Sequence, residues 1–124
     1  MLEWNHQIKG GIESMSKYEK KVYGDFSSIV NYLHEAVMSG SASSSYEDGS
    51  DYQDGDYQMA LRVYERYSWT GANRVSLTLV VAGSHQEYWV TAITSGGSQG
   101  LFMKVNTLGE SSFLETIVKA IDQL

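Results

Sequence analysis

Apolar residues recur at helical spacing in two stretches of the chain. The first follows Asp25, a good N-cap residue, and ends before Gly40, which suits the left-handed position just past a helix. The second closes the chain, and Thr107 and Glu110 ahead of it match a capping box, with Ser111 or Ser112 as the alternative cap of a helix that starts later. The sequence therefore predicts two amphipathic helices. Their apolar stripes are Phe26, Ile29, Val30, Leu33 and Val37, and Phe113, Leu114, Ile117, Val118, Ile121 and Leu124.

Elsewhere apolar and polar residues alternate with the period of a strand, and the turns use glycine, asparagine, aspartate and serine in place of proline. Short loops between successive strands indicate antiparallel hairpins. The expected strands are residues 18–23, about 42–46, 57–67, 74–82, 87–94 and 101–105, with an acidic turn at about 48–56.

The predicted order of elements is β-α-β-β-β-β-β-α. Because each helix has a single apolar stripe that must be buried, we expect an α+β fold in which both helices pack on one face of a curved antiparallel sheet. This order resembles the helix-grip and TATA-binding-protein-like topologies. The resemblance concerns element order alone and implies no shared activity.

Residues 57–67 place a carboxylate on an apolar strand face. The alternate positions from Met59 to Val63 are apolar and share that face with Glu65, so we expect the face to be buried. A buried carboxylate needs a partner or a shifted pKa. Glu65 could therefore orient a ligand or handle a proton, or it could pair with an arginine at the strand end.

The opposite face of the same strand holds Arg62, Tyr64 and Arg66, which we expect beside Ser76 and Thr78 on the open side of the sheet. Arginine and tyrosine are favoured at interaction hot spots. This face is a candidate partner site, and an ordinary solvated surface is the alternative.

Residues 95–100 form a glycine-rich loop in which the backbone N–H groups around Gly96 and Gly97 could hold an anion. The loop lacks the Lys-Ser/Thr ending of a P-loop and the long helix of a dinucleotide fingerprint. A connection that needs positive φ angles is the alternative.

No motif predicts catalysis or metal binding. The acidic residues at 47–56 do not have the spacing or the helical flanks of a calcium loop, and we interpret them as a solvated hairpin tip whose charges suppress edge pairing. Neither His34 nor His85 has a second ligand at metal-binding spacing, and no serine lies in a nucleophile elbow. We expect no metal, no cofactor and, on balance, no enzymatic activity.

The composition narrows the class of protein. The chain has 124 residues, no cysteine and a formal charge of −6, which argues against nucleic-acid and anionic-membrane binding. No stretch approaches a membrane span, and the absence of cysteine fits a reducing cytoplasm. We therefore expect a single cytoplasmic domain.

Residues 1–14 show no clear period, and Lys9-Gly10-Gly11 can be encoded by a purine-rich ribosome-binding sequence placed shortly before the Met15 codon. We interpret them as a non-native or mis-started leader. Residues 15–124 then form the α+β domain.

Four segments together carry a family resemblance: DGSDYQDGDYQ, VYERYSWTGANRVSLTL, ITSGGSQG and FMKVNTLGE. Over nearly everything after Ser14, the chain resembles a family of small, uncharacterised bacterial domains. The resemblance implies a compact cytoplasmic α+β domain and supplies no activity, substrate or catalytic residue.

Two functions fit these observations. The first is a non-catalytic binding or interaction domain that self-associates or holds a protein partner through its open sheet face or edge. The second is a small-ligand-binding domain with a pocket between the sheet and the last helix, where Glu65 would contact the ligand. A filled core favours the first, and a pocket lined by Glu65 favours the second.

Overall fold

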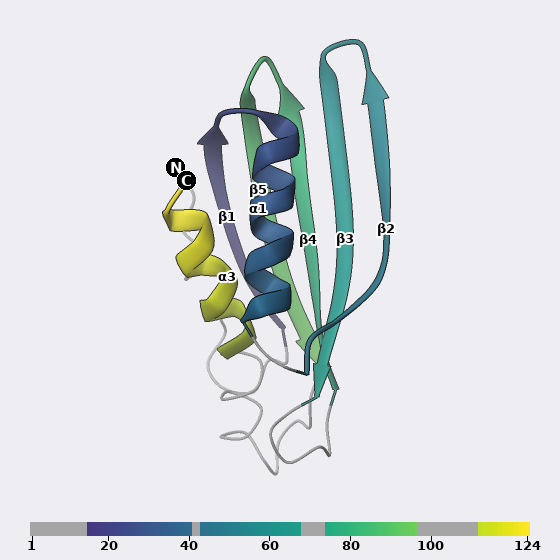
Figure 1. Cartoon of the computed structure of the whole chain (residues 1–124), viewed down its shortest axis with the longest axis vertical. Coiled ribbons are helices and arrows are strands. Elements are labelled where there is room, and N and C mark those ends of the chain that lie inside the picture. Colours follow the sequence, from purple (N-terminus) through teal and green to yellow (C-terminus); the bar gives the residue numbers. More distant parts are fainter. Residues whose placement is uncertain (1–14, 41–42, 68–73, 97–111) are drawn as a thin grey trace.

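The computed structural model describes residues 15–40, 43–67, 74–96 and 112–124. Within them the elements follow the order β-α-β-β-β-β-α (Figure 1). The strands are β1 (Met15–Tyr23), β2 (Ser45–Asp54), β3 (Tyr57–Tyr67), β4 (Arg74–Ser84) and β5 (Glu87–Gly96), and the helices are α1 (Phe26–Ser39) and α3 (Ser112–Asp122). The predicted leader, the predicted capping box and the predicted strand at 101–105 lie outside the described residues.

The five strands form one sheet in the order β1-β5-β4-β3-β2, and every neighbouring pair is antiparallel. Strands β2 to β5 follow one another as hairpins, whereas β1 pairs with the last of them. The first and second strands therefore lie at opposite edges, and α1 joins them across one face (Figure 1).

Helix α1 begins where the sequence predicts. The carboxylate of Asp25 accepts hydrogen bonds from the Ser28 backbone N–H at 3.0 Å and from its hydroxyl at 2.9 Å, and these bonds lower the pKa of Asp25. The end of the helix differs from the prediction. Gly40 has a φ of −76°, in the right-handed region, so no left-handed cap is formed there.

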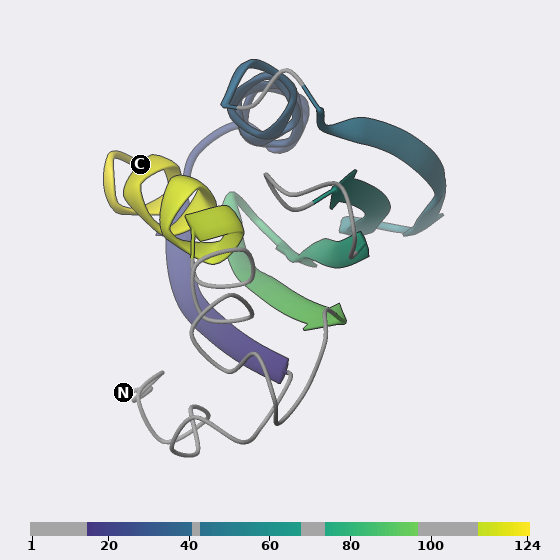
Figure 2. The same cartoon turned by 90° about the horizontal axis from the view of Figure 1, so that it is seen from below.

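Both helices lie on the same side of the curved sheet, which confirms the predicted α+β class (Figure 2). Their stripes meet alternate residues of β4 and β5 in one apolar core, and the aromatic rings of Phe26 and Tyr88 lie against each other there, with centroids 5.2 Å apart. The core is made of Val22, Ile29, Val30, Leu33, Val37, Ala60, Tyr64, Val75, Leu77, Leu79, Val81, Tyr88, Val90, Ala92, Phe113, Leu114, Ile117, Ala120 and Ile121.

The predicted faces of β3 are reversed. Ala60 and Tyr64 are buried under the helices, whereas the face of Glu65 is the one turned away from them. The prediction was wrong because both faces of this strand carry apolar side chains, so alternation alone could not identify the inner one. Arg62 and Arg66 consequently lie on the covered side, and not on the open one.

The acidic segment is also different from the prediction. Residues 45–54, predicted largely as a turn, form β2, an edge strand paired with β3 along its whole length. The turn is confined to Gly55 and Asp56, and a register shift between Tyr46 and Asp48 marks a β-bulge. Strong pairing to β3 outweighs the weak strand preference of aspartate and glycine here.

Candidate functional site

An open groove of about 340 Å³ lies between α1 and the two strands at the β2 edge of the sheet. The curved sheet extends past α1 and α3 at this edge, so neither of the described helices lies over its outer strand (Figure 2). Polar side chains from all three elements line the groove, which consists of Val30, Asn31, His34, Tyr46, Gly49, Asp51 and Arg62.

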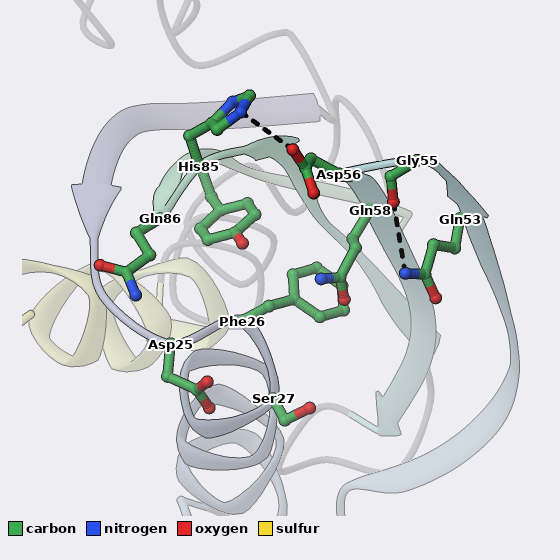
Figure 3. Close-up of a pocket in the computed structure, with 10 residues that line it drawn as sticks. Asp25, Phe26, Ser27, Gln53, Gly55, Asp56, Gln58, His85 and Gln86 are labelled. Atoms are coloured by element: carbon green, nitrogen blue, oxygen red, sulfur yellow. Dashed lines mark hydrogen bonds and ion pairs between the residues drawn. The ribbon is translucent and has the colours of Figure 1, made fainter.

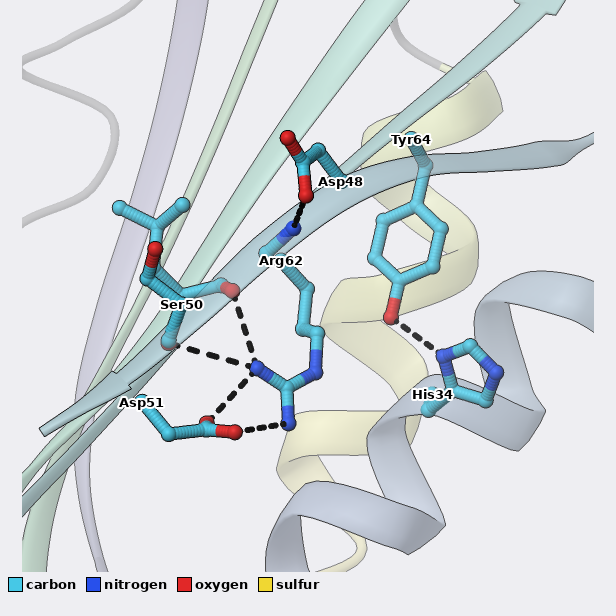
Figure 4. A network of polar contacts seen from close by, with 8 residues as sticks. His34, Asp48, Ser50, Asp51, Arg62 and Tyr64 are labelled. Carbon is cyan, nitrogen blue, oxygen red and sulfur yellow. Dashed lines mark hydrogen bonds and ion pairs between the residues drawn. The ribbon is translucent and has the colours of Figure 1, made fainter.

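Arg62 supplies the positive charge of the groove. Its guanidinium donates to both carboxylate oxygens of Asp51, at 2.8 and 3.4 Å, and to the carbonyl oxygens of Ser50 and Leu61, at 3.4 and 3.0 Å (Figure 4). The Arg62 side chain is 19% exposed and that of Asp51 is 64% exposed. The cation is thus held in place from the protein side, while its counter-ion faces solvent.

Of the groove's lining residues, His34 is hydrogen-bonded to a buried tyrosine, Tyr64. The Tyr64 hydroxyl lies 2.8 Å from Nδ1 of His34 (Figure 4), and both rings contact that of Tyr46. Burial is the main cause that raises the pKa of Tyr64 to about 12. The phenol therefore stays protonated at neutral pH and can donate its hydrogen to the imidazole.

The absence of a side chain at Gly49 allows Tyr46 and Arg62 to pack closely over β2. A Cβ at this position would lie 2.5 Å from the Leu61 carbonyl oxygen and 2.6 Å from the Tyr46 hydroxyl. Any larger residue would push β2 away from β3 or displace the tyrosine. The glycine thus lets Tyr46 and the stem of Arg62 close over the strand.

A second hollow of about 300 Å³ lies at the end of the sheet, between the N-terminus of α1 and the two hairpin tips. There His85 and Asp56 from the two tips approach to 3.0 Å between Nε2 and Oδ2 (Figure 3). Both side chains are about three-quarters exposed. This pair is a surface contact, so the hollow is a weaker candidate than the groove.

The structure separates the residues singled out in the sequence. Arg62 lines the groove and Tyr64 lies buried behind it, hydrogen-bonded to the lining residue His34, whereas Arg66 lies 4.7 Å from the centroid of the Phe113 ring, beside α3. Glu65 lies on the other side of the sheet, ion-paired with Arg74, which is the alternative interpretation of this carboxylate.

Gly96 ends β5 with a φ of +115°, and its missing Cβ leaves room for the carbonyl of Arg74. Gly97 lies outside the described residues. Sequence reasoning missed His34, Tyr46, Gly49 and Asp51 as members of one site. The signal was present in the acidic segment, but only its pairing to β3 brings it to Arg62.

Two general features bear on the kind of site. In the parts of the chain that the structure describes, no three or more His, Cys, Asp or Glu side chains gather as a metal site. No helix in the described ranges has the length and hydrophobicity needed to cross a membrane.

Structural similarity is weak. TTHA0849 from Thermus thermophilus aligns over 88% of this chain and 97% of its own, with 6% identity and a TM-score of 0.35. The human StarD13 (DLC2) lipid transfer and protein localization domain aligns over 89% of this chain and 78% of its own, with 8% identity and a TM-score of 0.36. Neither likeness is close enough to carry an argument about function.

No curated protein matches the chain. A family model does match, over residues 15–124, and it describes a family of unknown function. The chain therefore belongs to the family of unknown function DUF6054.

Proposed function

We propose that this protein is a binding domain that takes a small polar molecule with an anionic group in the groove between α1 and the β2–β3 hairpin. The observation that supports this best is the arginine in the groove. Its guanidinium is held by two backbone carbonyls from within, and its one carboxylate partner among the described residues is the solvent-facing Asp51. An incoming carboxylate or phosphate can replace that counter-ion without exposing any buried charge.

The other lining groups suit the same ligand class. Asn31 and Tyr46 bring neutral hydrogen-bonding side chains to the groove, and Asp51, once displaced, remains close enough to accept a bond from a donor on the ligand. The volume of about 340 Å³ is at the small end of ligand sites. A long apolar chain would leave these polar groups unpaired, so lipids are disfavoured.

The ligand pocket expected between the sheet and the last helix is replaced in this proposal by one beside the first helix. Phe113, Ile117 and Ile121 of α3 are at most 1% exposed and fill the space beneath their helix. Glu65 has no part in the proposed site, because it lies on the opposite face. We further propose that the domain acts in the cytoplasm, on the ground of its cysteine-free sequence.

The test is a nuclear magnetic resonance titration of the ¹⁵N-labelled chain with acetate, malate and inorganic phosphate in turn. We expect saturable shifts for at least one probe, centred on the backbone amides of Asn31, Gly49 and Arg62. Arg62→Gln should abolish them. Arg74→Gln removes the same kind of charge from the other face and should leave them unchanged.

Three results would contradict the proposal: no saturable shifts with any probe, equal shifts in Arg62→Gln, or equal loss in Arg74→Gln. A second variant tests the same site without changing Arg62, in case Arg62→Gln loses binding through a local folding defect. Asn31 is exposed on α1, so Asn31→Trp fills the mouth of the groove without entering the core and should also prevent binding.

A further inference from the structure

The sheet face turned away from the helices is unusually apolar. Strand register aligns its residues in rows that cross all five strands, and no described residue outside the sheet covers them. The three central rows are Lys21-Trp89-Ala82-Met59-Tyr52, Glu19-Thr91-Val80-Leu61-Ser50 and Lys17-Ile93-Thr78-Val63-Asp48. The rows have charged or polar residues on β1 and β2, apart from Tyr52, and mostly apolar residues between them, with Thr91 and Thr78 as the exceptions.

The size of this face is that of a specific interface. Strands about 4.8 Å apart and residues about 3.3 Å apart give five strands of nine residues an area of roughly 700 Å². A standard interface buries about 800 Å² on each partner. Large side chains stand out from it, with Trp89 43% exposed, Tyr57 46% and Tyr52 63%. The apolar residues of its three middle strands form one patch within this face, and exposed apolar patches rimmed by polar residues mark interaction sites.

The two edges of the face differ in charge. On β1, Lys17 and Lys21 alternate with Glu19, whereas the corresponding positions of β2 include Asp48 and Asp54. The β1 edge is therefore cationic on balance and the β2 edge is anionic. A partner that presents the same two edges in reverse order would complement both.

We propose that this partner is a second copy of the chain, packed sheet against sheet about a two-fold axis parallel to β4. Strand β4 is the central strand of the five, so this rotation lays each β1 over the partner's β2. Lys17 then faces Asp48, Trp89 faces Met59, and Ile93 faces Val63. Stacked sheets are usually rotated by about 30°, an offset that flexible lysine side chains can span.

The charges also select this axis over the alternative. An in-plane axis perpendicular to the strands would lay β1 on β1 and β2 on β2. With this axis along the central row, Lys17 would face Lys21 of the second copy and Glu19 would face Glu19, and such like-charge contacts oppose association. The proposal is independent of the groove, which opens on the other side of the sheet.

The experiment measures the mass of the full chain by analytical ultracentrifugation over a range of concentrations. The monomer mass is 13.8 kDa, and we expect twice this value at high concentration. Lys17→Asp and Asp48→Lys should each weaken the dimer about tenfold or more, because each creates two like-charge pairs across the two-fold interface. The double variant exchanges the charges and should restore dimerisation.

Controls carry the same charge changes on α3, away from the proposed interface. Lys119→Asp and Glu115→Lys are both exposed there and should leave the association unchanged. Trp89→Ser should abolish the dimer, and its circular dichroism spectrum checks that the fold persists. A chain that stays monomeric up to about 1 mM overturns the proposal. So does a dimer that either single charge variant leaves intact, or that the exchange fails to restore.

Discussion

The helix-covered face of the sheet has two unlike halves. Beneath α3, over β1 and β5, the side chains are apolar and fully packed, as Phe113 and Ile117 show with at most 1% exposure. Beyond α1, over β2 and β3, the same face is polar and hollow, and Arg62 and Asp51 form an ion pair in it. One face of one sheet therefore carries both the core and the candidate site.

The difference has a geometric cause. Two helices, each about 10 Å across, cover roughly 20 Å of a sheet that is about 24 Å wide. The described strands number five, and α1 and α3 lie toward the β1 side of their sheet, so no described helix lies above β2. A strand without cover keeps polar residues on its inner face. The groove therefore follows from where the two described helices lie on the sheet.

The largest expected effect is in the packed half. Ile117→Ala would leave a cavity beneath α3, because Ile117 is fully buried. We expect it to lower the free energy of unfolding by about 2–5 kcal/mol, measured by urea denaturation. Asn31→Ala in the hollow half should change it by less than about 0.5 kcal/mol, since the side chain is exposed. Similar losses for both variants would erase the contrast between the halves.

The second prediction compares two tyrosines that link the sheet to its helices. Tyr18 is hydrogen-bonded to Asp122 of α3, and Tyr64 is hydrogen-bonded to His34 of α1. Burial is the main cause that raises the pKa of each tyrosine to about 12. Since the unfolded phenol loses its proton near pH 10 and the folded one near pH 12, their contribution to stability is complete below pH 10. It is then lost as the pH rises to about 12.

For the buried Tyr64, a pKa raised by about two units, at about 1.4 kcal/mol per unit, limits its contribution to the free energy of unfolding to about 3 kcal/mol. Tyr64→Phe cannot ionise, so the decline in stability between about pH 10 and 12 should be shallower than in the wild type. Urea denaturation at several pH values measures this slope. Tyr23→Phe, at an exposed tyrosine of β1, is the matched control and should retain the wild-type slope. A variant Tyr64→Phe with that same slope would contradict the burial argument.

The sequence was sufficient where one periodicity dominates. The stripe from Ile29 to Val37 and the stripe of α3 each identify their helix, and β3 to β5 follow from alternation and short turns. The fold class follows from these elements. It needs no information about which strands lie at the edges, because any hairpin sheet with two apolar stripes must bury them together.

The site could not be found in the same way. The alternation of side chains along β3 predicted that Arg62 and Tyr64 lie on the open face, because the face that includes Leu61 is more apolar than the face of these two residues. Only the register of β2, shifted by the bulge before Asp48, brings Asp51 within reach of Arg62. Such long-range pairing depends on tertiary packing, which local patterns do not encode.

The third prediction tests whether the close approach at Gly49 maintains the hollow half. The Cβ of Gly49→Ala would meet the Leu61 carbonyl oxygen at 2.5 Å, and a backbone atom cannot move aside as a side chain can. We expect a loss of about 1–3 kcal/mol in the free energy of unfolding, by the usual cost of overpacking. Ser50→Ala, at the next and exposed position, should leave the free energy of unfolding nearly unchanged.

If Gly49→Ala also leaves the free energy of unfolding unchanged and the Arg62 side-chain resonances of that variant match the wild type, the groove owes its shape to something other than this glycine. The polar half of the face would then tolerate changes in strand spacing that the packed half does not.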